Sequence, residues 1–151
     1  MKLSTRSRYG TRMLLDLAKH SGQGPVGVGE ISKRQDISLK YLEKLTRILK
    51  KAGIIRSVRG AKGGYLLTRP PGEISMGEIV RVLEGDLSLV ACTNDRAACP
   101  RREICPTIGL WREVSLTLLE KLDSITLESL LASYPDELGP MPCPDLDERQ
   151  S

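Results

Sequence analysis

The first half of the chain spaces its apolar residues with the period of amphipathic helices. Residues 4–20 are predicted to form a first helix, which stops before Gly22. Its apolar stripe consists of Tyr9, Met13, Leu14 and Leu17. Residues 30–35 predict a short second helix with Ile31 facing inward, and Asp36 and Ile37 form the turn that follows. Two helices joined by so short a turn are typical of a helix-turn-helix unit.

Residues 38–53 predict the second helix of that unit. Ser38 is a suitable N-cap and Gly53 a suitable C-terminal stop. The buried stripe consists of Leu42, Leu45, Ile48 and Leu49. The opposite face carries Lys40, Glu43, Lys44, Arg47 and Lys51. Such a basic helix is sized for the major groove of duplex DNA.

A hairpin is predicted directly after this helix. Residues 54–59 and 65–69 read as short strands, and the glycine-rich turn 60–64 joins them. Arg59 and Lys62 lie at its tip, where they can reach phosphates or the minor groove. The fold class is therefore mainly α with a small β-hairpin wing: a winged helix-turn-helix DNA-binding domain plus a long dimerisation helix.

The long helix is predicted over residues 107–125. Its apolar positions form the series Trp111, Val114, Leu118, Leu122 and Ile125, widened by Leu110, Leu116 and Leu119. A stripe this wide indicates packing against a second copy of the chain, with packing in the chain's own core as the alternative. Shorter helices are predicted at residues 75–84 and 127–133. The expected division is 1–72 for DNA binding, 73–133 for the cysteine loop and dimerisation helices, and 134–151 for a disordered acidic tail.

Charge is distributed unevenly along the chain. Residues 1–69 carry 16 basic and 4 acidic side chains, whereas residues 113–151 carry 2 basic and 9 acidic ones. A face that only kept the protein in solution would mix the two signs, so we favour a polyanionic partner over a merely solvated surface. The chain has no Phe, which argues for double-stranded DNA rather than stacked single strands.

Other classes find little support in the sequence. No apolar run is long enough for a membrane span and no signal peptide is visible, so we expect a cytoplasmic protein with no membrane partner. The glycines of residues 22–27 match a dinucleotide pattern, but they follow a helix and include Pro25, which a βαβ unit does not allow. No catalytic motif is present, and we expect no enzyme activity.

Three cysteines share one polar loop. Cys92, Cys99 and Cys105 are separated by six and five residues. Zinc favours a closer pair and four ligands, and a disulfide would leave one thiol over, whereas an iron–sulfur cluster accepts wider thiolate spacing. The neighbouring arginines, Arg96, Arg101 and Arg102, would favour thiolates and offset a cluster's negative charge. The spacing leaves the three alternatives open in the order cluster, zinc, redox thiol.

The chain resembles the IscR-type family of iron–sulfur cluster regulators, winged-helix transcription factors of bacteria. The resemblance covers nearly all of residues 1–133 and rests on KLSTRSRYGTRMLLDLA, ISLKYLEKLTRILKKAGIIRSVRGAKGGYLL, the cysteine loop, LWREVS and ITLESLL. It implies a homodimer whose long helices cross. It also implies that Ser38, Lys40, Glu43 and Lys44 face the major groove, that Arg59 enters the minor groove, and that Cys92, Cys99 and Cys105 hold the cluster.

The fourth cluster ligand is not identifiable. Family members place a histidine or an acid at positions that are Ile108 and Arg8 in this chain. Asp95 and Glu103 are local candidates, and an open fourth position fits equally well, so 2Fe–2S and 4Fe–4S both stay possible. His20 is expected to be satisfied by carbonyls at a helix end, and Cys143, in the tail, to be free.

These observations predict a homodimeric, sequence-specific transcriptional regulator that binds double-stranded DNA. It would sense iron–sulfur, redox or nitric oxide status through the cysteine-ligated cluster. The alternative is a cluster-free regulator of the same fold, which acts through thiol oxidation or a metabolic-enzyme partner.

Overall fold

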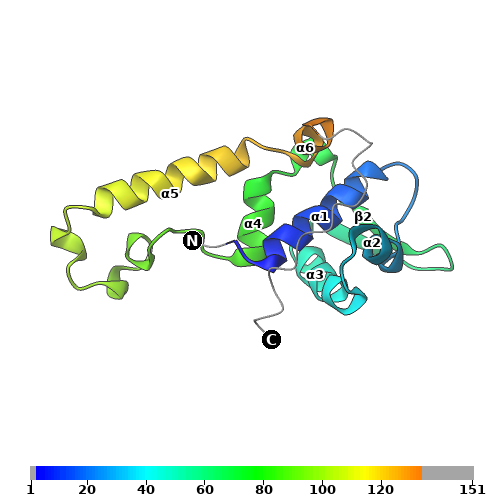
Figure 1. Cartoon of the computed structure of the whole chain (residues 1–151), viewed down its shortest axis with the longest axis horizontal. Coiled ribbons are helices and arrows are strands. Elements are labelled where there is room, and N and C mark those ends of the chain that lie inside the picture. The colour runs from blue at the N-terminus through cyan, green and yellow to red at the C-terminus, as the bar shows by residue number, and fades with distance from the viewer. Residues whose placement is uncertain (1–2, 134–151) are drawn as a thin grey trace.

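The computed structural model describes residues 3–133, and the predicted disordered tail and Cys143 lie outside them. The helices are α1 (Thr5–Lys19), α2 (Val28–Gln35), α3 (Leu39–Lys51), α4 (Met76–Glu84), α5 (Ile108–Asp123) and α6 (Leu127–Ser133). The strands are β1 (Ile55–Val58) and β2 (Gly64–Leu67). Short 3-10 turns are η1 (Pro71–Glu73), η2 (Ala91–Thr93), η3 (Arg96–Ala98) and η4 (Arg102–Ile104). The mainly α architecture with one hairpin is confirmed, and α5 extends away from a body formed by the other helices (Figure 1).

Serine residues are the N-caps of α1, α3 and α4. Ser4, Ser38 and Ser75 each accept a hydrogen bond from a backbone N–H of the first turn, as N-caps do. The predicted starts of α1 and α3 are therefore confirmed. The second helix begins at Val28 instead of Glu30, because the Glu30 carboxylate reaches back to the Gly27 N–H and belongs to the first turn.

One apolar cluster joins the helix-turn-helix to the helices that follow. Leu42, Leu45 and Leu49 of α3 are fully buried, as the spacing predicted. They pack with Met13, Leu14, Leu17, Ile31, Ile37, Ile74, Ile79, Leu83 and Leu127. Each such side chain contributes about 1.5–3 kcal/mol through burial. The cluster contains residues from both sides of residue 72, and the division of the chain into a DNA-binding part and a dimerisation part at that residue stays a prediction.

The wing is a two-stranded antiparallel hairpin in which Ile55 pairs with Leu67 and Val58 with Gly64. The first strand ends at Val58 instead of residue 59, because the ladder closes at the Val58–Gly64 pair and the turn between Gly60 and Gly63 takes over. The second strand runs over residues 64–67 instead of 65–69, since its last ladder pair is Leu67 with Ile55. Arg59 and Arg69 are therefore outside the strands. Val26 adds a short bridge to Tyr65, with N···O distances of 3.0 and 2.9 Å, and this bridge seats the wing against the α1–α2 loop.

The long helix α5 does not fill the core of its own chain. Ser115 is the one buried residue among its 16. Leu110, Trp111, Val114 and Leu116 are 53, 40, 41 and 51% exposed. The alternative of packing within the chain is therefore wrong for these side chains. Within residues 3–133, no helix is both long and apolar enough to cross a membrane.

Candidate nucleic-acid interface and cysteine loop

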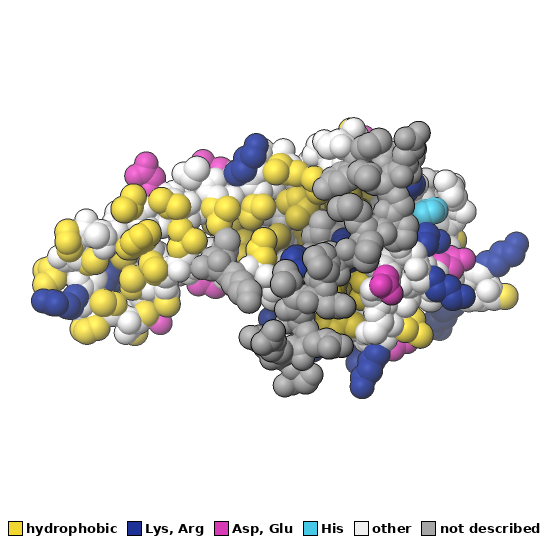
Figure 2. Space-filling view, in the orientation of Figure 1, with side chains coloured by type: hydrophobic (Ala, Val, Ile, Leu, Met, Phe, Trp, Pro, Cys, Tyr) yellow, Lys and Arg dark blue, Asp and Glu magenta, His cyan; other side chains and the backbone are white. Residues whose placement is uncertain are grey.

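Every side chain predicted to contact DNA is exposed. On α3 and its N-cap these are Ser38, Lys40, Glu43, Lys44 and Arg47, and on the wing Arg59 and Lys62. The buried stripe of α3 turns the charged face outward. Lys and Arg side chains project from the wing end of the molecule, while apolar side chains gather over α5 at the other end (Figure 2). The basic end agrees with the charge pattern of the sequence, and the apolar end agrees with the wide apolar stripe predicted for the long helix.

A pair of tyrosines fixes the first turn of α3 against α1. The rings of Tyr9 and Tyr41 meet edge to face with centroids 5.7 Å apart, and the Tyr41 hydroxyl lies 3.1 Å from Thr5 Oγ1. The guanidinium groups of Arg8 and Arg12 lie 5.9 and 5.7 Å from the centroid of the Tyr9 ring. The start of α3 and these arginines therefore belong to one continuous surface.

Arg12 of α1 has a structural role. Its guanidinium donates to the carbonyl oxygen of Gln35 and, at 3.3 Å, to the Gln35 side-chain oxygen. These bonds satisfy the C-terminal end of α2, where carbonyls lack helical partners. Arg12 therefore ties α1 to the turn of the helix-turn-helix.

The buried carboxylate of Asp16 is a second tie between α1 and α2. Arg34 Nη2 and Nε donate to its two oxygens at 2.7 and 3.0 Å, and Gln35 Nε2 donates at 3.0 Å. Burial alone would raise the pKa of Asp16, but the hydrogen bonds from Arg34 and Gln35 and the charge of Arg34 outweigh it, so the pKa is lowered. His20 Nδ1 lies 2.7 Å from the Asp16 carbonyl, which confirms the helix-end role expected for His20.

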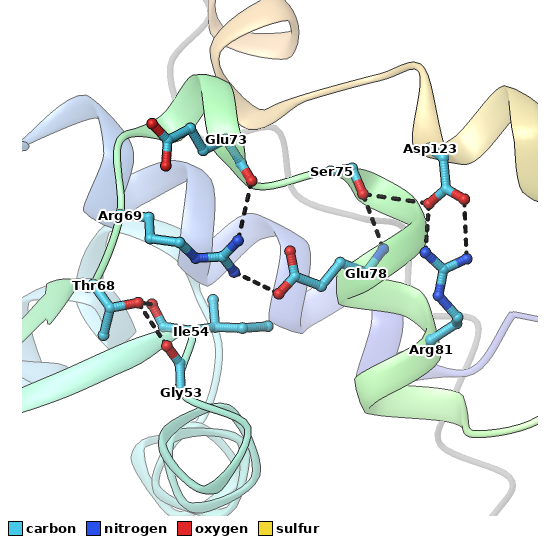
Figure 3. A network of polar contacts seen from close by, with 9 residues as sticks. All are labelled: Gly53, Ile54, Thr68, Arg69, Glu73, Ser75, Glu78, Arg81 and Asp123. Atoms are coloured by element: carbon cyan, nitrogen blue, oxygen red, sulfur yellow. Dashed lines mark hydrogen bonds and ion pairs between the residues drawn. The ribbon is translucent and has the colours of Figure 1, made fainter.

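The base of the wing is anchored on both sides (Figure 3). Thr68 donates from Oγ1 to the carbonyls of Gly53 and Ile54, at 2.6 and 3.0 Å, and so holds the wing to the end of α3. Arg69 pairs with Glu78 of α4 and donates to the Glu73 carbonyl at 3.2 Å. The sequence places Arg69 at the end of the second predicted strand, and nothing in the local pattern indicates a partner nine residues away.

The cysteine loop is built from successive 3-10 turns. Cys92, Cys99 and Cys105 are half-buried free thiols. Arg102 donates from Nε to the Cys92 carbonyl at 2.8 Å and from Nη2 to the Thr93 carbonyl at 3.3 Å. Its guanidinium therefore shapes the loop backbone, a role that the sequence did not reveal.

The thiol of Cys105 is perturbed by the groups around it. The Thr107 side chain, with Oγ1 3.4 Å from Sγ, and the Thr107 backbone N–H hydrogen bond to its sulfur and lower the pKa of Cys105; the Ile108 N–H and the charge of Arg101 add to this. A larger thiolate fraction makes the sulfur a better ligand and a better nucleophile.

The donor set of the loop fits an iron–sulfur cluster in kind, because thiolates are its usual ligands. Among residues 3–133, however, no three His, Cys, Asp or Glu side chains converge as a site for a metal ion. Asp95, a candidate fourth ligand, caps η3 by accepting from the Ala97 N–H at 2.8 Å. Holding a cluster would therefore require the loop to bring its three thiols closer together.

Comparison with known proteins places the chain in a family. Residues 3–133 match the Rrf2 family, described as "Iron-dependent Transcriptional regulator". The chain belongs to the Rrf2 family. It is 47% identical over 131 residues to Protein rrf2 of Nitratidesulfovibrio vulgaris, covering 87% of each chain. It is 42% identical over 136 residues to CymR of Bacillus subtilis, covering 90% of this chain and 93% of CymR.

IscR proteins are similar to the chain at nearly the same level. IscR of Pectobacterium carotovorum is 40% identical over 131 residues, which is 87% of this chain and 79% of that protein. Among solved structures, CymR of B. subtilis, the global cysteine regulator, aligns with a TM-score of 0.75 at 38% identity, covering 89% of this chain and 99% of CymR. IscR of T. potens aligns at 0.71 and 42% identity, covering 88% of each chain.

The predicted resemblance to IscR-type regulators is confirmed at the level of the family and its winged-helix fold. This Rrf2-family chain is a transcriptional regulator, and its relatives CymR and IscR are HTH-type transcriptional regulators. IscR and CymR match it almost equally well, so the comparison does not distinguish between ways of sensing.

Proposed function

We propose that this protein is a homodimeric, sequence-specific DNA-binding regulator of the bacterial cytoplasm whose affinity for DNA depends on the state of its cysteine loop. The observation that carries the proposal is the joint exposure of the basic face of α3 and the tip of the wing. A helix with one basic face and an adjacent arginine-tipped hairpin match the major groove and its flanking backbone.

Each exposed residue of this face has a chemical role in the proposal. Lys40, Lys44 and Arg47 are cations that would bind phosphates and set the position of α3 in the groove. Glu43 would accept a hydrogen bond from the amino group of cytosine and disfavour bases that offer only acceptors. Ser38 keeps its hydroxyl proton free to donate while its oxygen caps α3. Arg59 and Lys62 would reach the minor groove or the adjacent phosphates.

The exposed apolar face of α5 supports the homodimer. Leu110, Trp111 and Val114 share one face of the helix and are exposed, and burying them against a second α5 would remove this apolar area from water. A two-fold dimer presents two recognition helices to two half-sites about one helical turn apart. The basic faces of both copies would then bind the same side of the duplex.

The cysteine loop is the proposed sensor, with Cys92, Cys99 and Cys105 as ligands of a 2Fe–2S or 4Fe–4S cluster. When bound, the cluster supplies a group that is lost or altered by iron limitation, oxidants or nitric oxide. The loop is connected to α5 through the Leu89 N–H, which donates to Ser115 Oγ at 3.2 Å. A rearrangement of the loop would therefore act on the helix that pairs the two subunits.

Protein purified without oxygen tests the cluster. A visible absorption spectrum, with iron and sulfide assayed on the same sample, should show charge-transfer bands and matching iron and sulfide. These should be lost when any of Cys92, Cys99 or Cys105 is replaced by alanine. A colourless protein that stays iron-free after reconstitution with iron and sulfide would refute the cluster and leave DNA binding standing.

A cluster-free sensor is the second candidate. It is favoured by the three free thiols and by the similarity to CymR of Staphylococcus aureus, which has been solved in an oxidized form at 40% identity. In this case, oxidation of the iron-free protein should change its affinity for DNA, and dithiothreitol should reverse the change. DNA affinity that is equal in the reduced and oxidised states would exclude it.

A further inference from the structure

The end of α5 that meets the body is held by several hydrogen bonds to α4 and to the residue that caps it. Arg81 of α4 donates to both carboxylate oxygens of Asp123, with Nη2–Oδ1 2.6 Å and Nη1–Oδ2 3.2 Å, and Ser75 Oγ lies 3.4 Å from Oδ1 (Figure 3). Immediately beyond α5, the Met76 N–H donates to the Ile125 carbonyl at 2.7 Å. We call Ser75, Gly77, Arg81 and Asp123 the α4–α5 joint.

Gly77 makes this close approach possible. A Cβ atom on Gly77 would lie 1.9 Å from Asp123 Oδ1 and 3.1 Å from the Asp123 nitrogen. Any larger residue would push the carboxylate, and with it the last turn of α5, away from α4. The joint therefore fixes position as well as charge.

A role in stability alone does not account for the joint. The side chains of Arg81 and Asp123 are 45 and 44% exposed, and ion pairs so accessible to water contribute little to folding. What the joint controls is direction, because the rest of α5 extends from the body as a lever (Figure 1). The 16 residues of α5 span about 24 Å at 1.5 Å per residue.

Because α5 is long, a small change of its angle at the joint would move its far end by a distance that matters for DNA binding. A tilt of about 10° at the joint moves the far end of α5 by about 4 Å, which is close to the 3.4 Å rise of one base pair. In a two-fold dimer built on α5, both joints tilt, and the separation of the two recognition helices changes with them.

We propose that the α4–α5 joint sets the half-site spacing that the dimer accepts, with Asp123, Arg81 and Gly77 as positioning residues for DNA recognition. This inference rests on the proposed homodimer. Because α4 also carries Glu78, the partner of Arg69 at the wing base, the joint and the wing share one rigid helix. The angle of α5 is thereby set relative to the DNA-reading elements themselves.

The test uses the full-length protein and a duplex selected by it from random DNA. Spacer variants of that duplex, from two base pairs shorter to two longer, and a single half-site are titrated by fluorescence anisotropy. Wild-type protein should prefer one spacing. The Asp123→Ala and Gly77→Ala variants should bind the duplex of that spacing about tenfold more weakly, which is about the effect of one unfavourable base pair. Their affinity for a duplex whose spacing differs by one base pair should change less than twofold.

The matched control is Glu120→Ala, which removes an exposed acid from the same helix outside the joint. It should keep the wild-type spacing profile, and all variants should bind a single half-site within twofold of wild type. The inference would be overturned if both joint variants lost the same affinity at every spacing, or if both kept the wild-type spacing profile. Binding of DNA by a dimeric wild-type protein would still uphold the proposed function in either case. A wild-type protein that is monomeric in ultracentrifugation, or that selects no duplex, would refute the proposed function first.

Discussion

Replacing Asp16 by asparagine tests whether one buried carboxylate fixes α2 against α1. The substitution keeps size and shape but removes the charge and one of the two acceptor oxygens. At least one of the bonds from Arg34 is lost, and the new amide group faces a guanidinium that it cannot satisfy. We expect the variant to fold and to be clearly less stable.

The expected loss is about 2 kcal/mol. Removing one partner of a fully buried pair costs about 3–5 kcal/mol, whereas a hydrogen bond to a charged group contributes about 1.5–3 kcal/mol. The Asp16 side chain is 2% exposed but that of Arg34 is 37% exposed, so Arg34 can return to water and the lower range applies. For a chain of this length, 2 kcal/mol lowers the melting temperature by about 4–8 °C.

Urea denaturation followed by circular dichroism measures the difference in unfolding free energy between wild type and variant. The same measurement at several pH values tests the direction of the pKa shift. The pKa of Asp16 is lowered in the folded state by Arg34 and Gln35 against the effect of burial. Its contribution is therefore fully present above the unfolded pKa of about 3.9 and is lost as the pH falls through the folded pKa. The difference in unfolding free energy between wild type and variant should therefore be smaller at pH 3 than at pH 7, and the loss should set in below about pH 4.

Asp36→Asn is the matched control. Asp36 is exposed and has a φ of 51°, a left-handed conformation that asparagine accepts, so its replacement should change stability by less than about 0.5 kcal/mol. If Asp16→Asn were as mild as this control, or if its cost did not vary between pH 3 and 7, the ionic tie between α1 and α2 would be refuted.

Three further predictions concern the wing and the recognition helix. Arg59→Ala should weaken binding of a cognate duplex by about tenfold or more in anisotropy titrations, and unchanged binding would contradict the wing assignment. Glu43→Ala should relax base choice at one position in competition assays, and a uniform loss for every sequence would argue against readout. Gly64→Ala places a Cβ 2.4 Å from the Val26 carbonyl and should cost about 2 kcal/mol in urea denaturation. Gly29→Ala, with nothing within 4 Å, should cost nothing, and equal effects of the two would contradict the close approach.

Local chemistry made the elements around the DNA-binding face predictable. Ser38 was recognisable as an N-cap because hydroxyls satisfy the first free amides of a helix, and the structure shows that bond to Tyr41. Gly53, with a φ of 76°, stands where a left-handed residue ends α3. The exposure of Lys40, Glu43 and Arg47 followed from the helical period alone.

The ties between elements were not predictable in the same way. Asp16 and Arg34 are hydrogen-bonded across a separation of 18 residues, and Arg81 and Asp123 across a separation of 42 residues. Over such separations a single sequence carries no periodic signal. The outward course of α5 follows from these ties, although its apolar face was visible in the sequence. The 3-10 turns of the cysteine loop were missed because polar, proline-containing segments have no hydrophobic pattern to read.

Three side chains of α4, Glu78, Arg81 and Glu84, connect this helix to the wing base, to α5 and to α1, which limits how a signal can travel. Glu84, at the C-terminal end of α4, accepts from the Ser4 N–H, Ser4 Oγ and Ser7 Oγ at 2.9, 2.7 and 2.6 Å and so holds α1. Glu78 forms an ion pair with Arg69 at the wing base, and Arg81 forms one with Asp123 of α5. A change in the cysteine loop that leaves α4 in place should leave the DNA-reading surface of one subunit intact, because Glu84 holds α1 to α4 and Glu78 holds the wing base to α4. It can change the course of α5, so the sensing proposed for this loop should alter the spacing between the two DNA-binding units of the proposed dimer and leave each unit intact.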